Sequence, residues 1–514
     1  MSFDRAARRG YRRWRLPLDQ VAMTLMAGLL VLSALLVLLG DHAGAKVQKF
    51  SWQERTVGAE NVAFTLTFTR PMDPDSVESN LQITPDLPGR ISWAGRRLAY
   101  TLDAPIPYGE SYMVTVPEAR DRLSEADDEM QFEPFEGTFQ SRDRAIAYIG
   151  SEGEDTGRLI LSNFSQETGA TALTPSDWQV LDFEPYPLGD RILVSAIPVA
   201  AAESATPPPA AELYAVATGL APLPPEDNVD SDRTVSFEPG EVGAVTPILG
   251  SNGYQNLAFD LSPDGQTIVV QRVNQANPAD FGPWVVTEDS APRRLDTEPG
   301  GEFLIGPDSA SLLMLQGQGT AVIPLDPDAT ATATAEPLDF LPEFGRVFDI
   351  TSDGTAAAMV NFNQNDPERR FVETLVLVTN QGEETELLDA TGSIISAEFD
   401  PTDRILYVLA SDLLPSEEYQ EQPFLAAIAL TDEPQPLRLL NFPPQARVSM
   451  NISPDGLAAI LAVALSPDGN PANEQVQTVL LPLFQTTEQR LAGIPTATEP
   501  NILPLAGNQP TWLP

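Results

Sequence analysis

The amino-acid sequence predicts an all-β protein: a β-sandwich followed by a seven-bladed β-propeller, behind a single N-terminal transmembrane helix. Three observations lead to this expectation. The 514 residues include 48 prolines and 34 glycines that separate short apolar runs, and a hydrophobic content of 42% is enough for sizeable cores. The stretch NLAFDLSPDGQTIVV, residues 256–270, recurs in rougher copies along the second part of the chain. Residues 21–40 carry no charge.

Residues 1–15 form a basic tail, and residues 16–41 are predicted to form the transmembrane helix. The tail holds six arginines and one aspartate, and the uncharged residues after it can cross a bilayer as a helix of about 30 Å. Because basic residues are retained inside, the N-terminus is expected in the cytoplasm and the bulk of the chain outside the cytoplasmic membrane. The alternative is a secreted protein, cleaved near Ala45, where small residues form an acceptable site.

Residues 50–140 are predicted to form the sandwich. Phe64, Leu66 and Phe68 alternate with polar residues, and further short alternating runs follow with turn residues between them, as is typical of two packed sheets. The strand end FTRPMDPDSV, the pair Trp93 and Leu98, and the segment PYGESYMVTV resemble the SbsA-type bacterial immunoglobulin-like domain. This resemblance implies a spacer or stalk without catalytic residues. Asp73 and Asp75 are interpreted as turn formers and not as metal ligands.

Residues 141–514 are predicted to form the propeller, closed by the C-terminal strand. The recurring unit combines an alternating strand, a Ser-Pro-Asp-Gly turn and a second apolar strand, which indicates a hairpin. Its period lies mostly in the forties, the length of a propeller blade. The first copy lacks a strand before its turn, and NQPTWLP at the C-terminus supplies one, so that no sheet edge stays open. The turn positions are Asp143, Gly189, Gly265, Ser309, Gly354, Asp403 and Gly456.

This unit resembles the TolB-type or PD40 propeller repeat, a WD40-like repeat in which SPDG follows the innermost strand. Residues 255–270 and 447–462 match it well, residues 346–360 match it loosely, and the copy around Ser309 matches it poorly. Because the motif is irregular, six or eight blades remain open alternatives. The family includes periplasmic scaffold proteins and propellers attached to peptidases, so the resemblance narrows the fold more than the activity.

The amino-acid composition argues against several kinds of catalytic site. There is no cysteine and the one histidine is His42, so a thiolate nucleophile, a Ser-His-Asp triad and sites with Cys or His metal ligands are not expected in the exported part. A formal net charge of −43 disfavours nucleic acid as a partner. The repeated Asp264 and Asp455 are explained by turn formation. No catalytic, cofactor-binding or metal-binding residue is predicted, and no cofactor.

Together these patterns predict a membrane-anchored extracytoplasmic binding or scaffold protein, not an enzyme, that presents its propeller to an unknown protein or a cell-surface glycan. Two alternatives stay open. One is a propeller-type glycan-active enzyme that uses paired carboxylates, for which 73 acidic residues supply candidates but no specific pair. The other is a structural component of the cell envelope.

Overall fold

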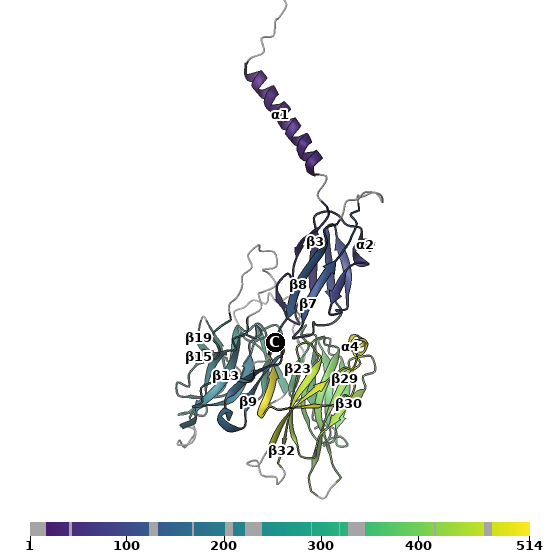
Figure 1. Ribbon diagram of the computed structural model, residues 1–514. Coiled ribbons are helices and arrows are strands. Elements are labelled where there is room, and N and C mark those ends of the chain that lie inside the picture. Colours follow the sequence, from purple (N-terminus) through teal and green to yellow (C-terminus); the bar gives the residue numbers. More distant parts are fainter. Residues whose placement is uncertain are drawn as a thin grey trace, which may run out of the picture.

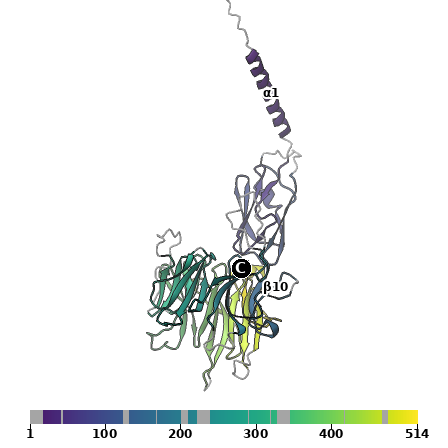
Figure 2. The ribbon, with the colours of Figure 1, turned by 90° about the vertical axis from the view of Figure 1, so that its left-hand side faces the viewer.

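The protein is all-β in its folded units, as predicted, and it consists of a smaller sandwich followed by a larger ring of sheets (Figure 1). The view turned by 90° shows the same succession from helix to sandwich to ring (Figure 2). The computed structural model describes residues 17–40, 44–122, 132–166, 169–200, 209–221, 239–288, 290–317, 319–326, 345–415, 418–466 and 475–514.

Helix α1 (Pro17–Gly40) precedes both β units. Its described side chains, residues 21–34, are all exposed. A bilayer span needs about 20 consecutive apolar residues, and within the described residues no helix is both long and apolar enough to cross a membrane. The predicted transmembrane helix is therefore not supported. The basic tail, residues 1–15, lies outside the described residues.

The sandwich consists of two four-stranded sheets with the orders β1-β3-β6-β5 and β2-β8-β7-β4. Every second residue of β3, including Phe64 and Leu66, packs against its counterparts on β7, such as Val114, and all of these side chains are fully buried. The alternation in the sequence thus gives each sheet one apolar face. The elements are β1 (Val47–Phe50), β2 (Thr56–Val57), β3 (Ala63–Phe68), α2 (Pro74–Glu78), β4 (Gln82–Thr84), β5 (Gly89–Ala94), β6 (Arg97–Leu102), β7 (Ser111–Val116) and β8 (Phe135–Ser141).

Seven sheets, here called blades 1 to 7, form the β-propeller in the described residues. Blade 1 contains β9 (Ala145–Gly150), β10 (Leu159–Asn163), β11 (Thr171–Ala172) and β35 (Gly507–Trp512). Blade 2 contains β12 (Trp178–Pro185), β13 (Arg191–Pro198), β14 (Glu212–Ala217) and β15 (Val245–Leu249). Blade 3 contains β16 (Tyr254–Leu261), β17 (Thr267–Asn274), β18 (Phe281–Thr287) and β19 (Ser290–Arg294). Blade 4 contains β20 (Phe303–Ile305), β21 (Ser311–Gln316) and β22 (Gly319–Pro324).

The three remaining blades have four described strands each. Blade 5 contains β23 (Val347–Ile350), β24 (Ala356–Asn361), β25 (Glu373–Thr379) and β26 (Glu384–Ala390). Blade 6 contains β27 (Ile394–Phe399), β28 (Ile405–Leu413), β29 (Glu421–Ala429) and β30 (Pro436–Asn441). Blade 7 contains β31 (Arg447–Ile452), β32 (Ala458–Leu465), β33 (Gln475–Pro482) and β34 (Asn501–Leu503), with helix α4 (Thr487–Ala492) between its last two strands.

The innermost strands of the blades lie next to one another around the axis of the ring, with β16 beside β20, β23 beside β27 and β31 beside β35. The last strand of the chain, β35, pairs antiparallel with β9 of blade 1. The innermost strands of blades 2 to 7 each end in a tight turn, and the turn residue adopts the left-handed conformation, with φ between +54° at Ser309 and +71° at Gly354. Glycine reaches this conformation without strain, which explains its place in the repeat.

The sandwich contacts the propeller at the end of the ring that carries these turns (Figure 1). The backbone N–H of Tyr108 donates to the Asp455 carboxylate at 3.1 Å, and Arg490 of α4 donates to the carbonyl oxygens of Pro105 and Asp455. Asp455 is buried and also holds its own turn through Ser453. The opposite end of the ring, where the innermost strands begin, is therefore the end that the sandwich leaves uncovered.

Candidate active site at the axis of the propeller

A polar side chain recurs at one position of the innermost strand, the residue before the last. Glu184, Asp260, Asp349 and Glu398 occupy it in blades 2, 3, 5 and 6, and Asn451 occupies it in blade 7. These five side chains are called the axial ring below. Each of them lies five residues before the turn position that the repeat defines. That constant offset is the signal in the sequence that could have singled them out.

Each member of the axial ring accepts a hydrogen bond from a backbone N–H of the next blade. The donor is always the last residue of the neighbouring innermost strand, so one side chain joins the two blades at each of these five junctions. The bonds run from Leu261 to Glu184 (3.0 Å), from Ile305 to Asp260 (2.5 Å), from Phe399 to Asp349 (2.8 Å), from Ile452 to Glu398 (3.0 Å) and from Trp512 to Asn451 (2.7 Å).

Two junctions of the ring depart from this arrangement. Between blades 1 and 2 the donor position is Pro185, which has no N–H. Between blades 4 and 5 the acceptor position is Leu304, whose side chain cannot accept a hydrogen bond, and the N–H of Ile350 donates instead to Asp349 of its own strand at 2.8 Å. The junction of blades 4 and 5 is therefore the one that keeps a donor but lacks the acceptor.

Burial between the innermost strands raises the pKa of all four axial carboxyl groups. The pKa of Asp260 and of Asp349 rises to about 6, and that of Glu398 rises to about 8, where the neighbouring Asp349 adds to the effect of burial. The pKa of Glu184 is also raised, by burial and by Asp260. At neutral pH, Glu398 is thus mostly protonated while the carboxyl beside it is mostly ionised.

Asp349 and Glu398 are held side by side by the backbone. Asp349 Oδ2 accepts the N–H of Phe399, the residue that follows Glu398. Glu398 Oε1 accepts from Ile452 and from the Asn451 amide, whereas its Oε2 has no hydrogen bond within the described residues. This leaves one oxygen of Glu398 without a hydrogen-bond partner in the described structure, and this oxygen can carry the proton that the raised pKa retains.

A pocket of about 340 Å³ lies at the start of β20, β23 and β27. Val347 of β23 and Ser396 of β27 line it. Asp349 and Glu398 follow these two residues by two positions on the same strands. Arg346 lines the same pocket. Its guanidinium binds both oxygens of Glu302 at 2.8 and 2.9 Å and donates to the carbonyl of Ile395. The charge of Arg346 is therefore already neutralised by a protein carboxylate.

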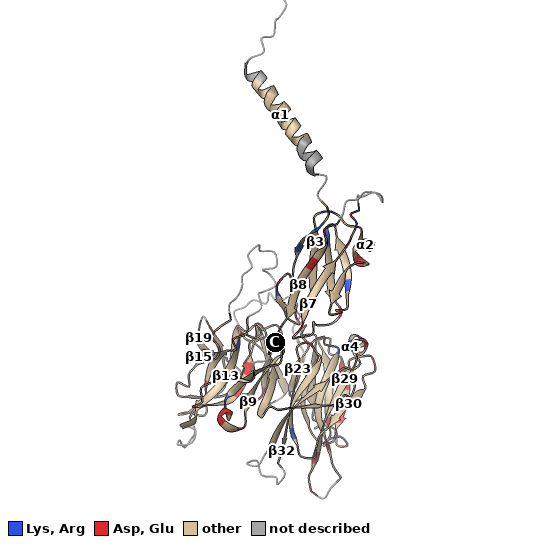
Figure 3. Cartoon of the chain, in the orientation of Figure 1, with Lys and Arg blue, Asp and Glu red and all other residues tan. Residues whose placement is uncertain are grey.

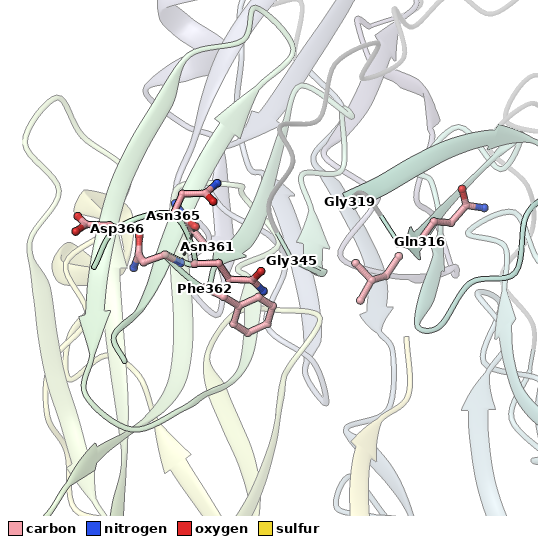
Figure 4. A pocket seen from close by; sticks show the side chains of 11 residues that line it. Gln316, Gly319, Gly345, Asn361, Phe362, Asn365 and Asp366 are labelled. Atoms are coloured by element: carbon pink, nitrogen blue, oxygen red, sulfur yellow. Dashed lines mark hydrogen bonds between the residues drawn. The ribbon is translucent and has the colours of Figure 1, made fainter. Parts of the chain in front are cut away.

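A second pocket, of about 640 Å³, adjoins the first at Leu315, which lines both. It lies between blades 4 and 5, at the junction where Leu304 replaces a hydrogen-bond acceptor. Figure 4 shows Phe362, Asn361 and Asn365 on the wall from blade 5 and Gln316 on the wall from blade 4. Among the described residues, no lysine or arginine lines this pocket.

The sequence predicted no site residue, and the axial carboxylates were missed. Asp264, which the sequence assigned to turn formation, holds its own turn, and Asp353 does the same in blade 5. Trp178 packs on Tyr214 with ring centroids 4.3 Å apart. Among the described residues, no three His, Cys, Asp or Glu side chains gather as a metal site. Acidic residues are scattered over both units instead of gathering at one place (Figure 3).

Comparisons with known proteins identify similar structures but no family. No family model and no curated protein matches the sequence. An oligogalacturonate lyase from Vibrio parahaemolyticus is 10% identical, with a TM-score of 0.42 over 74% of this chain and 99% of that one. A structure from a study of two prolyl endopeptidases is 10% identical, with a TM-score of 0.41 over 77% of this chain. A puromycin hydrolase is 15% identical, with a TM-score of 0.35 over 75% of this chain and 60% of that one.

These matches correct the expected function. The chain spans about half the length (48%) of the prolyl endopeptidase that it matches, and at such identities the likeness transfers neither a reaction nor a substrate to it. The named activities are nevertheless those of propeller enzymes, and the expectation of a non-catalytic binding or scaffold protein is wrong by this finding. That expectation inferred the absence of catalysis from the scarcity of histidine and cysteine. The inference fails because carboxylate acid–base chemistry needs neither residue.

Proposed function

We propose that the chain is a propeller-type glycan-active enzyme that hydrolyses glycosidic bonds with paired carboxylates. Glu398 is the proton donor and Asp349 carries the negative charge that stabilises the cationic sugar. The observation that carries this proposal is the pair itself: two neighbouring carboxyl groups at the axis with a pKa of about 8 and about 6. Pairs of carboxyl groups whose environments separate their pKa values are the usual acid and base of glycoside hydrolysis.

The reaction follows from these protonation states. The Oε2–H of Glu398 protonates the oxygen that leaves as the bond to the anomeric carbon breaks, and the ionised Asp349 stabilises the positive charge that develops on the sugar ring. Water supplies the oxygen that binds the anomeric carbon, and its released proton returns to Glu398. The hydrogen bonds to Asp349 from Phe399 and Ile350 fix its carboxylate and leave further lone pairs for the charge.

Location and organisation complete the proposal. The basic N-terminal tail and the uncharged stretch after it support an extracytoplasmic location. The enzyme would there act on glycan of the cell surface. The sandwich would then be an immunoglobulin-like spacer of the SbsA type, and the seven blades a TolB-like propeller, as the sequence motifs suggest. Fractionation of cells that express the full chain tests the location independently of the activity.

The proposal is tested with the purified full chain and a panel of neutral and acidic polysaccharides, by release of reducing ends between pH 5 and 9. Activity is expected to be highest between about pH 6 and 8, since Asp349 is protonated below this window and Glu398 loses its proton above it. Glu398→Gln is expected to lower the rate by about 100-fold or more, because the carboxamide cannot donate the proton.

Glu184→Gln is the matched control. Glu184 has the same position in its strand and the same kind of bond to the next blade, but it belongs to blade 2. Both substitutions keep an oxygen that accepts the backbone N–H, so both variants should fold. A parent that releases no reducing ends from any substrate, or a Glu398→Gln variant as active as Glu184→Gln, contradicts the proposed function.

A further inference from the structure

The larger pocket, at the junction of blades 4 and 5, has a lining that differs from the acidic character of the chain as a whole. The polar side chains that line it in the described structure are chiefly amides, with one carboxylate, Asp366, as the only charged residue among them. In the part of the chain described, the amides of Gln364 and Asn365 form no hydrogen bond. Free amide groups both donate and accept hydrogen bonds, which matches the hydroxyl groups of a sugar.

An aromatic ring is fixed at the same place. Phe362 is 38% exposed, although large apolar side chains of this kind are usually covered. Its ring lies directly over Gly345: a Cβ built at residue 345 would be 2.2 Å from Cε2 of Phe362. Glycine at this position therefore lets the ring lie against the backbone, with the rest of its surface open to the pocket (Figure 4).

Asn363 anchors the loop between β24 and β25, which carries these side chains. This residue is buried, has a φ of +51°, and donates through Nδ2 to the Val372 carbonyl and to Thr374 Oγ1, both at 2.8 Å. Asp366 adds two bonds within the loop, since its N–H donates to the Asn363 carbonyl and its Oδ1 accepts from Glu368. Ligand-binding groups on a loop tied down in this way need little ordering when a ligand binds.

Charge decides which class of sugar fits. No cationic side chain lines the larger pocket within the described parts of the chain, and in the smaller one Arg346 is already bound to Glu302. A polyuronate or a sulfated glycan would bring negative charge to a chain of net charge −43 without meeting a free basic side chain in either pocket. An uncharged oligosaccharide meets amides for its hydroxyl groups and an aromatic face for its C–H groups.

We propose that the pocket lined by Gln316, Gly345, Asn361, Phe362, Gln364 and Asn365 binds an uncharged oligosaccharide, with Phe362 as the stacking surface. The inference rests on the proposed function, because it makes this pocket the part of the site that holds the glycan while the bond to be cleaved lies at the axis. The shared wall at Leu315 connects the pocket to the smaller one next to Glu398 and Asp349.

The test is calorimetric binding of three hexasaccharides to the full chain carrying Glu398→Gln, in which turnover is expected to be slower by about 100-fold or more. The probes are the uncharged hexamers of glucose and of N-acetylglucosamine and the anionic hexamer of galacturonic acid. Binding of an uncharged hexamer is expected, and adding Phe362→Ala should weaken it by about fivefold. Gly345→Ala should weaken binding similarly. This variant keeps Phe362, but the added Cβ pushes the phenyl ring out of its position.

Phe371→Ala is the matched control, since Phe371 is a more exposed phenylalanine (78%) of the same loop that does not line the pocket. Equal affinity of the Phe362→Ala and Phe371→Ala variants, absence of binding, or preference for the galacturonate hexamer would overturn the inference. Binding that depends on Phe362 in a chain that cleaves nothing leaves the inference standing and refutes the proposed catalysis. Cleavage that Phe362→Ala leaves unchanged supports the proposed catalysis and refutes the role of this pocket in binding the glycan.

Discussion

Replacing Glu398 by glutamine is expected to stabilise the protein at pH 9 and to change its stability little at pH 5. In the folded state the pKa of this carboxyl is about 8, against 4.5 for an ordinary glutamate. The folded state therefore binds the proton more tightly than the unfolded state. Its contribution to stability is fully present below about pH 4.5 and is lost as the pH rises through about 8.

The size of the effect follows from the two pKa values. Between pH 5 and pH 9 the parent is expected to lose about 4 kcal/mol of unfolding free energy through Glu398 alone, at about 1.36 kcal/mol for each pKa unit. The glutamine variant keeps the acceptor for Ile452 and has no proton to lose. Asp349 and Asp260 act with the same sign, but they are present in both proteins and largely cancel in the difference.

Urea unfolding of parent and variant at pH 5, 7 and 9 measures this difference. The gap between the two midpoints should widen toward pH 9 in favour of the variant. Glu383→Gln serves as the control, because Glu383 is exposed on the turn between β25 and β26 and keeps its hydration on folding. If the midpoints of parent and Glu398→Gln move in parallel with pH, Glu398 is not a buried group of raised pKa and the assignment of the proton donor fails.

Three further predictions concern the fold. Deletion of residues 509–514 removes the pairing of β35 with β9 and the buried Trp512, and proteolysis should then degrade the propeller rapidly; resistance equal to that of the parent contradicts the closure. Gly456→Val forces a β-branched residue to a φ of +69° and should cost about 1 kcal/mol or more in thermal unfolding, whereas Gly169→Val should cost little. Asp455→Ala leaves the N–H of Tyr108 unpaired at the contact with the sandwich, and calorimetry should show the junction destabilised by about 1–3 kcal/mol.

The sequence predicts most of the architecture because the information is local. In the copy at residues 256–270, alternating apolar residues, a proline, an aspartate and a glycine follow one another within one hairpin, and the structure gives Gly265 a φ of +69°. The all-β class and the propeller then follow from repetition. The transmembrane helix rested on composition in one stretch alone, and the described residues do not support it.

The candidate site could not be predicted in the same way. Glu184, Asp260, Asp349 and Glu398 are four of 73 acidic residues, and they stand out only when the repeats are aligned, by their constant offset of five residues from the turn position. Their raised pKa values arise because strands 45 to 77 residues apart come together at the axis, which no short pattern contains. The pocket beside Phe362 likewise depends on Gly345, seventeen positions away in the sequence, lying beneath the ring.

Leu304 makes the junction of blades 4 and 5 one of the two junctions of the ring that lack an axial hydrogen bond in the described structure. At five junctions, separating neighbouring innermost strands breaks a bond from an axial side chain to a backbone N–H, whereas between β20 and β23 there is no such bond to break among the described residues. Local opening is expected first where the fewest bonds resist it. Amide hydrogens of β20 and β23 should thus exchange with deuterated solvent faster than those of β27 and β31, because the ring opens more readily between blades 4 and 5 than between blades joined by an axial bond.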